Sequence, residues 1–172
     1  MHPAYGAGHA TVAGACITIL KLFFDMFEDP RSTNLRAYPA KIYEATVDGK
    51  SLKSATIPKG TKITIAGELN KLAANISIGR NMAGVHYYSD YYDSVRLGER
   101  IAVGIVQEQM TNYPDSIELR FPSFDNKTMT IEGGGCKEGD LGIPKVFIGD
   151  GPDQKEADAA WWLCNHASSI IA

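Results

Sequence analysis

Cysteine is scarce in this chain, and it has neither an excess of positive charge nor a long uncharged apolar run. Cys16, Cys136 and Cys164 are too few and too widely spaced for a zinc site or a disulfide framework. The 17 basic and 20 acidic side chains give a net charge of −3, which does not favour nucleic acid or an anionic membrane as a partner. The longest apolar-leaning run ends at Lys21, and no signal-peptide pattern is visible, so we predict neither a membrane span nor a secretory leader.

The composition that remains is that of an ordinary folded protein. Hydrophobic residues make up 44% of the 172 residues and charged residues 22%, which argues against a disordered chain. A chain of this length can bury one core but not two comfortable ones. We therefore expect one soluble domain, or a piece of one.

Hydrophobic periodicity predicts three helices in the first two thirds of the chain. A run over residues 10–27 is apolar on nearly every side, so we predict a buried helix that ends at Asp29-Pro30, with Cys16 packed inside. Helical spacing recurs over residues 63–82, where Gly84 marks the stop, and over residues 90–112. An Asp-Gly turn between the first two helices predicts a small hairpin over residues 43–52.

The last third of the chain has a different composition. Residues 116–121 and 127–131 read as two strands, and residues 153–171 as a final helix. These elements predict a mainly α fold, in which a helical body carries small β-hairpin elements and a C-terminal tail. We divide the chain into a helical portion, 1–113, and a tail, 114–172, within the same domain.

Residues 6–9, Gly6-Ala7-Gly8-His9, stand at the start of the first predicted helix. Glycines let successive backbone N–H groups converge, and a helix N-terminus adds unpaired donors and partial positive charge, so this stretch can bind an anion. His9 would then be placed to exchange protons near neutral pH. A capped helix start with a structural histidine fits the same residues, and the pattern alone leaves both interpretations open.

A second candidate stretch joins the second and third predicted helices. Arg80 offers a planar set of donors that suits an oxyanion, and His86 and Asp90 are four residues apart on one helix face. The carboxylate can hold one imidazole nitrogen and leave the other free as a ligand or nucleophile. A surface arginine beside a stabilising helix pair is the alternative. Four tyrosines nearby, Tyr87, Tyr88, Tyr91 and Tyr92, could line a pocket, but aromatic residues at this spacing are expected mainly in a core.

Taken together, these two stretches resemble the vanadium-dependent haloperoxidases, in particular the bromoperoxidase group of red algae and cyanobacteria. That family shares its site with the type 2 phosphatidic acid phosphatases, and its pattern has three blocks, KxxxxxxRP, PSGH and SRxxxxxHxxxD. The second block matches residues 5–9, with Ala7 in place of the usual serine. The third matches Gly79-Arg80, His86 and Asp90 with the spacing intact. The first block is absent, because none of the eight prolines follows an arginine.

The resemblance implies a role for each matching residue. His86 is the implied axial ligand of vanadium, and Asp90 would orient its ring. Arg80 and the Gly8 N–H, in a stretch that includes Ala7, would hold vanadate oxygens. His9 would be the acid–base residue, and His2 would match a histidine that supports the site from behind the ligands. The implied cofactor is vanadate, and the implied substrates are hydrogen peroxide and bromide.

The resemblance also implies a helical bundle of the haloperoxidase and acid phosphatase type, of which this chain is the C-terminal portion. We expect helix 10–27 to seek a partner, either the N-terminal half of the enzyme or another copy in a homo-oligomer. Two other functions stay open. One is a phosphatase with His86 as nucleophile and His9 as proton donor. The other is a non-catalytic remnant or assembly module, which the absent first block favours.

Overall fold

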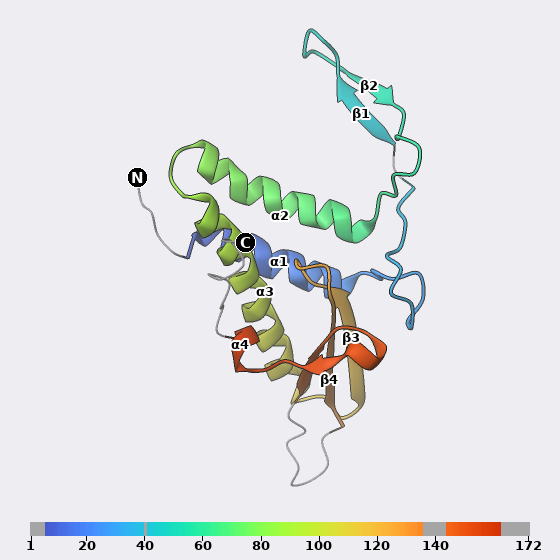
Figure 1. The fold of residues 1–172 in the computed structure, drawn as a ribbon, viewed down its shortest axis with the longest axis vertical. Coiled ribbons are helices and arrows are strands. Elements are labelled where there is room, and N and C mark those ends of the chain that lie inside the picture. The colour runs from blue at the N-terminus through green and yellow to red at the C-terminus, as the bar shows by residue number, and fades with distance from the viewer. Residues whose placement is uncertain (1–5, 40, 136–143, 163–172) are drawn as a thin grey trace.

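Three helices form the body of the part of the chain that the structure, a computed structural model, describes: residues 6–39, 41–135 and 144–162. They are α1 (Gly8–Phe23), α2 (Ile65–Met82) and α3 (Tyr88–Met110), and a single turn, α4 (Ala159–Trp162), follows near the end. The helix α1 packs on both α2 and α3 (Figure 1). None of the helices in these ranges is both long enough and apolar enough to cross a bilayer. The three predicted helices are confirmed, with shifted ends.

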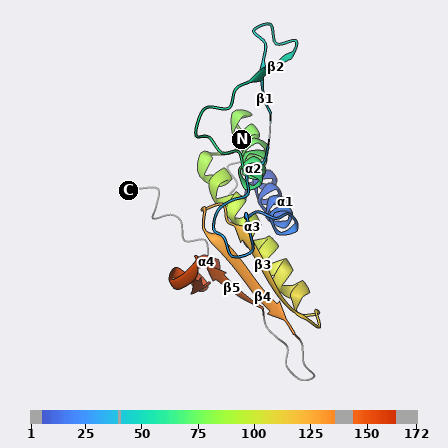
Figure 2. The same ribbon diagram turned by 90° about the vertical axis from the view of Figure 1, so that its right-hand side faces the viewer.

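The strands of the described residues form two antiparallel sheets. A hairpin of β1 (Ile42–Ala45) and β2 (Leu52–Ala55) projects away from the helices (Figure 1). A second sheet has the order β3 (Ser116–Pro122), β4 (Thr128–Gly134), β5 (Lys145–Ile148) and β6 (Lys155–Glu156), and its first two strands lie against α1 and α3 (Figure 2). The fold is therefore a helical bundle joined to a four-stranded sheet, and the prediction of a mainly α chain with small hairpins understated the sheet.

The first helix is shorter and more exposed than its composition predicts. It ends at Phe23 because Phe24 is extended, and Met26 then enters a separate buried cluster with Ala66. The predicted stop at Asp29-Pro30 is wrong, since the apolar run continues past the helix to supply that cluster. The prediction of burial on every side is also wrong, because Phe23 is 79% exposed and Cys16 is exposed.

Two glycines allow α1 and α3 to approach each other closely. A Cβ atom on Gly14 of α1 would lie 2.1 Å from the Val95 carbonyl oxygen of α3. A Cβ on Gly98 of α3 would lie 2.1 Å from the Thr11 carbonyl oxygen of α1. Real side chains cannot occupy such positions, so the glycines fix how near the two helices come. This contact sets the position of the start of α1 relative to α3.

The tail differs most from its prediction. Strands over 116–121 and 127–131 are confirmed, but the helix predicted from residue 153 is wrong for residues 153–158. Gly149 and Gly151 have positive φ angles, a short 3₁₀ turn spans Gly151–Asp153, and β6 then pairs with β5. Strands as short as β5 and β6 carry too little periodicity to be found in the sequence. The predicted positions 163–171 lie outside the described residues.

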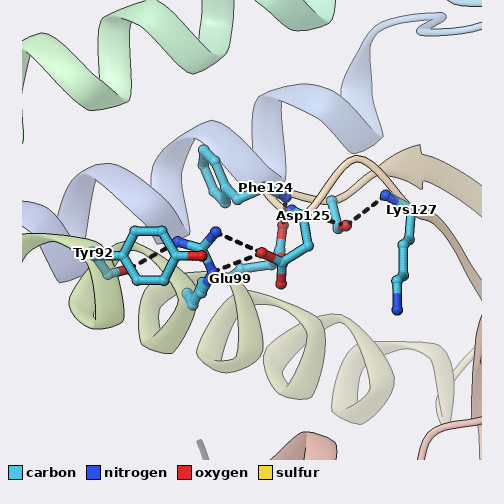
Figure 3. A network of polar contacts seen from close by, with 7 residues as sticks. Tyr92, Glu99, Phe124, Asp125 and Lys127 are labelled. Carbon is cyan, nitrogen blue, oxygen red and sulfur yellow. Dashed lines mark hydrogen bonds and ion pairs between the residues drawn. The ribbon is translucent and has the colours of Figure 1, made fainter. Parts of the chain in front are cut away.

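Side chains from α3 join the sheet in one apolar core and one polar network. The core contains Val103 and Met110 of α3 and Phe121 and Met129 of the sheet, all at most 1% exposed. The network anchors the β3–β4 turn (Figure 3). In it, Arg96 Nε donates to Asp125 Oδ1 at 2.8 Å, and the Phe124 N–H donates to Glu99 Oε2 at 2.9 Å. The sheet is thus fixed to the helix that carries the candidate site, a contact no motif predicted.

Candidate functional site

The α2–α3 connection holds Arg80 and His86 on either side of one tight turn. Arg80 lies in the last turn of α2, and the Val85 N–H donates back to the Arg80 carbonyl at 3.1 Å. Gly84 adopts a φ of +70°, which glycine accepts without strain and which reverses the chain after the helix. The predicted stop at Gly84 is therefore confirmed. The two side chains are presented by the ends of two rigid helices.

His86 lies two residues before α3, so the prediction that it shares a helix face with Asp90 is wrong, but its side chain still faces Asp90 in the first turn of that helix. His86 Nδ1 lies 3.9 Å from Asp90 Oδ2, and each side chain is only 9% exposed. That separation is longer than a hydrogen bond, and Asp90 Oδ2 instead accepts the Tyr87 N–H at 3.0 Å. Asp90 therefore caps the start of α3 while its charge faces the imidazole. Because Nδ1 is the ring atom turned to the carboxylate, Nε2 is the atom that remains for another partner.

Two buried nitrogens at this turn lack a hydrogen-bond partner within the described residues. They are Arg80 Nε and His86 Nδ1. A buried donor without an acceptor costs about 1–3 kcal/mol, so structures keep such groups where something else satisfies them. An oxyanion is the natural acceptor for a guanidinium. The donors present at this turn thus fit an anion of the phosphate or vanadate type.

The start of α1 is tied to the same end of α3. The Ala7 N–H donates to Ser94 Oγ at 2.9 Å, and Ala7 is 2% exposed. Ser94 lies one turn after Asp90, so the two sequence blocks meet on the first two turns of α3 (Figure 1). Gly6, with a φ of +92°, directs the chain into this position. The N–H groups of the first helical turn, including that of Gly8, have no acceptor within the helix and are free to bind an anion.

The other predicted site residues are either exposed or outside the described residues. His9 is an exposed residue in the first turn of α1. His2, Cys136 and Cys164 lie outside the described residues. Ser94, which accepts the Ala7 N–H and so positions the start of α1, is a residue that sequence reasoning missed. Its only signal is its place four residues after Asp90 on the same helix face.

Residues of this chain resemble those of a known family and of curated proteins. Residues 1–115 match a family described as the VCPO second helical-bundle domain. A vanadium-dependent bromoperoxidase of Corallina officinalis is 49% identical over 130 residues, which are 76% of this chain and 20% of that protein. A vanadium-dependent bromoperoxidase of Ascophyllum nodosum is 32% identical over 143 residues, which are 78% of this chain and 24% of that protein. The chain thus spans about a fifth of the length of the first of these relatives.

Proposed function

The chain belongs to the vanadium haloperoxidase family, and we propose that it supplies the histidine and arginine part of a vanadate-dependent bromoperoxidase. The match over residues 1–115 and the two bromoperoxidase relatives support this proposal. The observation that carries it is the buried Arg80 Nε at the α2–α3 turn, which has no hydrogen-bond partner within the described residues and lies beside the end of α3 to which the start of α1 is bound.

In this proposal His86 would hold vanadium through its imidazole, and Asp90 would be a positioning residue for that imidazole. Arg80 and the Gly8 N–H, in the stretch that includes Ala7, hold vanadate oxygens by hydrogen bonds. When bound, vanadate supplies a Lewis acid that activates hydrogen peroxide, which is reduced to water as bromide is oxidised to hypobromous acid.

Two further histidines of this chain would transfer a proton and stabilise the site. His9, at the start of α1, would accept or donate a proton at the site. His2 would stabilise the site from behind the ligands. The helix N-terminus adds partial positive charge that favours an anion.

A partner completes the site in this proposal. The chain has no KxxxxxxRP block, so the further cations must come from the N-terminal half of the enzyme or from another copy. The outer face of α1 exposes Val12 to 63%, Ile19 to 42% and Phe23 to 79%. These residues follow one helix face, which supports a covering partner there.

Vanadate binding tests the role of His86 directly. We would titrate the chain with vanadate and follow binding by ⁵¹V NMR, comparing the wild type with His86→Ala. Met82→Ala, at an 84% exposed position in the last turn of α2, is the matched control. We expect His86→Ala to lose at least about tenfold in affinity and the control to lose nothing. Equal affinities for all three proteins would overturn the assignment.

A second assay separates the haloperoxidase from the phosphatase. The chain, joined to the upstream segment where needed, is loaded with vanadate and given bromide, hydrogen peroxide and a halogen acceptor, and a vanadate-free sample is given an aryl phosphate. We expect bromination that His86→Ala abolishes. Steady phosphate release without bromination would support the phosphatase instead, and the absence of both activities in the wild type would favour an assembly module.

A further inference from the structure

A cavity separate from the candidate anion site lies between α2 and α3. Its volume is about 220 Å³. Its walls include Asn70, Ala73 and Ala74 from α2 and Tyr88, Tyr91 and Tyr92 from α3. We call it the tyrosine pocket. The two alanines leave the space that larger side chains on α2 would fill, so the packing of the helices creates the cavity.

The tyrosine pocket offers aromatic surface of defined geometry. The rings of Tyr88 and Tyr91 meet edge to face with centroids 5.3 Å apart, and those of Tyr88 and Tyr92 are stacked with centroids 6.1 Å apart. The ring of Phe124, from the β3–β4 turn, also lines the pocket. Aromatic groups gain free energy from such contacts beyond the area that they bury. A cavity of about 150 Å³ already holds a benzene ring, so this one has room for a substituted single ring.

The charges around the pocket are already paired, so a neutral ligand fits better than an ion. Arg96 lines the cavity, but its Nε donates to Asp125 Oδ1 at 2.8 Å and its Nη1 donates to the Tyr92 carbonyl at 3.0 Å. Its guanidinium also covers the Tyr92 ring, 3.5 Å from the centroid. Burial raises the pKa of Tyr91, with a smaller contribution from Tyr88, so the Tyr91 phenol stays neutral at physiological pH.

Asn70 lines the pocket, and its buried amide oxygen, Oδ1, lacks a hydrogen-bond partner within the described residues. A buried amide oxygen without a donor is costly, and a ligand that supplies the donor recovers that cost. An amide can also turn about χ2 to present its NH₂ group. A hydroxyl group, which both donates and accepts, suits either orientation.

We propose that the tyrosine pocket binds a small phenol, with its ring against Tyr88 and Tyr91 and its hydroxyl group on the Asn70 amide. The proposal goes beyond the proposed function and does not depend on it, because none of these contacts involves vanadate or the residues that would hold it. Tyr88 follows His86 by two residues, so the pocket begins within one helical turn of the candidate anion site along the chain.

The test uses 4-fluorophenol and 4-fluoroanisole as probes and the ¹⁹F NMR signal of each as the readout. The 172-residue chain is titrated without vanadate, bromide or peroxide, so failure here is distinct from failure of the haloperoxidase proposal. We expect 4-fluorophenol to bind with a Kd on the order of 1 mM, which is reasonable for so small a ligand. Its affinity should exceed that of 4-fluoroanisole about fivefold, because the methyl ether has no donor for Asn70.

Two substitutions on α2 separate the cavity from the hydrogen bond. Ala74→Leu fills the cavity, and we expect both probes to lose about tenfold or more in affinity. Asn70→Leu removes the polar partner, and we expect the preference for the phenol over the ether to disappear. The matched controls are Ala83→Leu and Asn75→Leu, at exposed positions at the end of α2 and on its surface, and neither should change binding.

Several results would overturn the proposal. They are the absence of 4-fluorophenol binding at millimolar concentration, unchanged affinity in Ala74→Leu, and an unchanged phenol-to-ether ratio in Asn70→Leu. Far-UV circular dichroism checks that each variant is folded. If Ala74→Leu does not fold, the comparison of Asn70→Leu with Asn75→Leu decides the matter by itself.

Discussion

Lys21 and Glu99 form a buried ionisable pair between α1 and α3, and the pair predicts an unusual dependence of stability on pH. Lys21 is 0% exposed and Glu99 is 3% exposed. Lys21 Nζ lies 3.8 Å from the centroid of the Phe124 ring and has no hydrogen-bond partner within the described residues. The Glu99 carboxylate accepts the Phe124 N–H. Lys21 and Glu99 belong to neither proposed site, although both contact Phe124, whose ring lines the tyrosine pocket.

Burial shifts both groups toward their neutral forms. It lowers the pKa of Lys21 to about 8, although the attraction of Glu99 acts in the opposite direction. It raises the pKa of Glu99 to about 7, against the attraction of Lys21, the Phe124 hydrogen bond and the charge of Arg100. A difference of one unit in the pKa of a group between the unfolded and folded states changes the free energy of unfolding by about 1.4 kcal/mol. Each shift therefore corresponds to about 3 kcal/mol, and the deep burial leaves little solvent screening to reduce it.

The two shifts change stability in opposite pH ranges. The pKa of Glu99 is higher in the folded state than its ordinary value of 4.5, so its contribution to stability is complete below that value and is lost as the pH rises through about 7. The pKa of Lys21 is lower in the folded state than its ordinary value of 10.5, so its contribution to stability is complete above that value and is lost as the pH falls through about 8. The pair therefore destabilises the fold most between pH 7 and pH 8.

The double substitution Lys21→Met and Glu99→Gln removes both charges at similar volume. Methionine can pack against Phe124, and glutamine keeps an acceptor for the Phe124 N–H. We expect the double variant to be more stable than the wild type at pH 7.5 by about 1–4 kcal/mol, as for other buried pairs replaced without a cavity. The advantage should shrink by about 3 kcal/mol toward pH 5 and again toward pH 10, because the wild type neutralises one partner at each extreme.

Urea unfolding followed by far-UV circular dichroism at pH 5, 7.5 and 10 measures this profile. Lys62→Met with Glu28→Gln is the matched control, because it removes an ion pair of 2.6 Å whose side chains are 48% and 45% exposed. The control should give a profile parallel to the wild type in this range. A flat difference between the double variant and the wild type across pH would refute the reasoning, as would the same profile in the control.

Three further predictions concern packing and helix capping, each measured by urea unfolding. Gly98→Ala should destabilise the fold by about 3 kcal/mol, because its Cβ would collide with the Thr11 carbonyl. Gly104→Ala should be neutral or stabilising, because a Cβ at that position of the same helix meets open space. Equal effects of the two substitutions would contradict the close contact between α1 and α3. Phe121→Ala should cost about 3–5 kcal/mol because Phe121 is 0% exposed in the core under the sheet, and a loss below about 1 kcal/mol would show that the sheet does not share this core. Thr64→Ala should cost about 1 kcal/mol, since Thr64 Oγ1 accepts the Gly67 N–H at 3.0 Å as the N-cap of α2, and Thr64→Ser should recover most of it.

Local signals in the sequence were sufficient to find the three long helices, the first hairpin and the strands β3 and β4. Gly84 ends α2 as predicted because only a positive φ closes that turn, and the hairpin forms around Gly49, which has a φ of +68°. The nearness of His86 to Asp90 was predicted, but its assumed reason was wrong, because His86 precedes α3 and does not share a helix face with Asp90. The division at residue 113 and the roles of the site residues remain predictions.

Contacts between distant segments decided the rest. The apolar run 10–27 has the composition of one buried helix, but only packing shows that α1 ends at Phe23, that its outer face is exposed and that Met26 belongs to another cluster. The hydrogen bond from Ala7 to Ser94 joins residues 87 positions apart, and the pairing of β6 with β5 replaces a predicted helix. By itself the sequence determined the helices, the turns and the two motif blocks, because each depends on neighbouring residues. Tertiary structure alone decided which faces are covered and where the blocks meet, because burial depends on segments that sequence periodicity does not bring together.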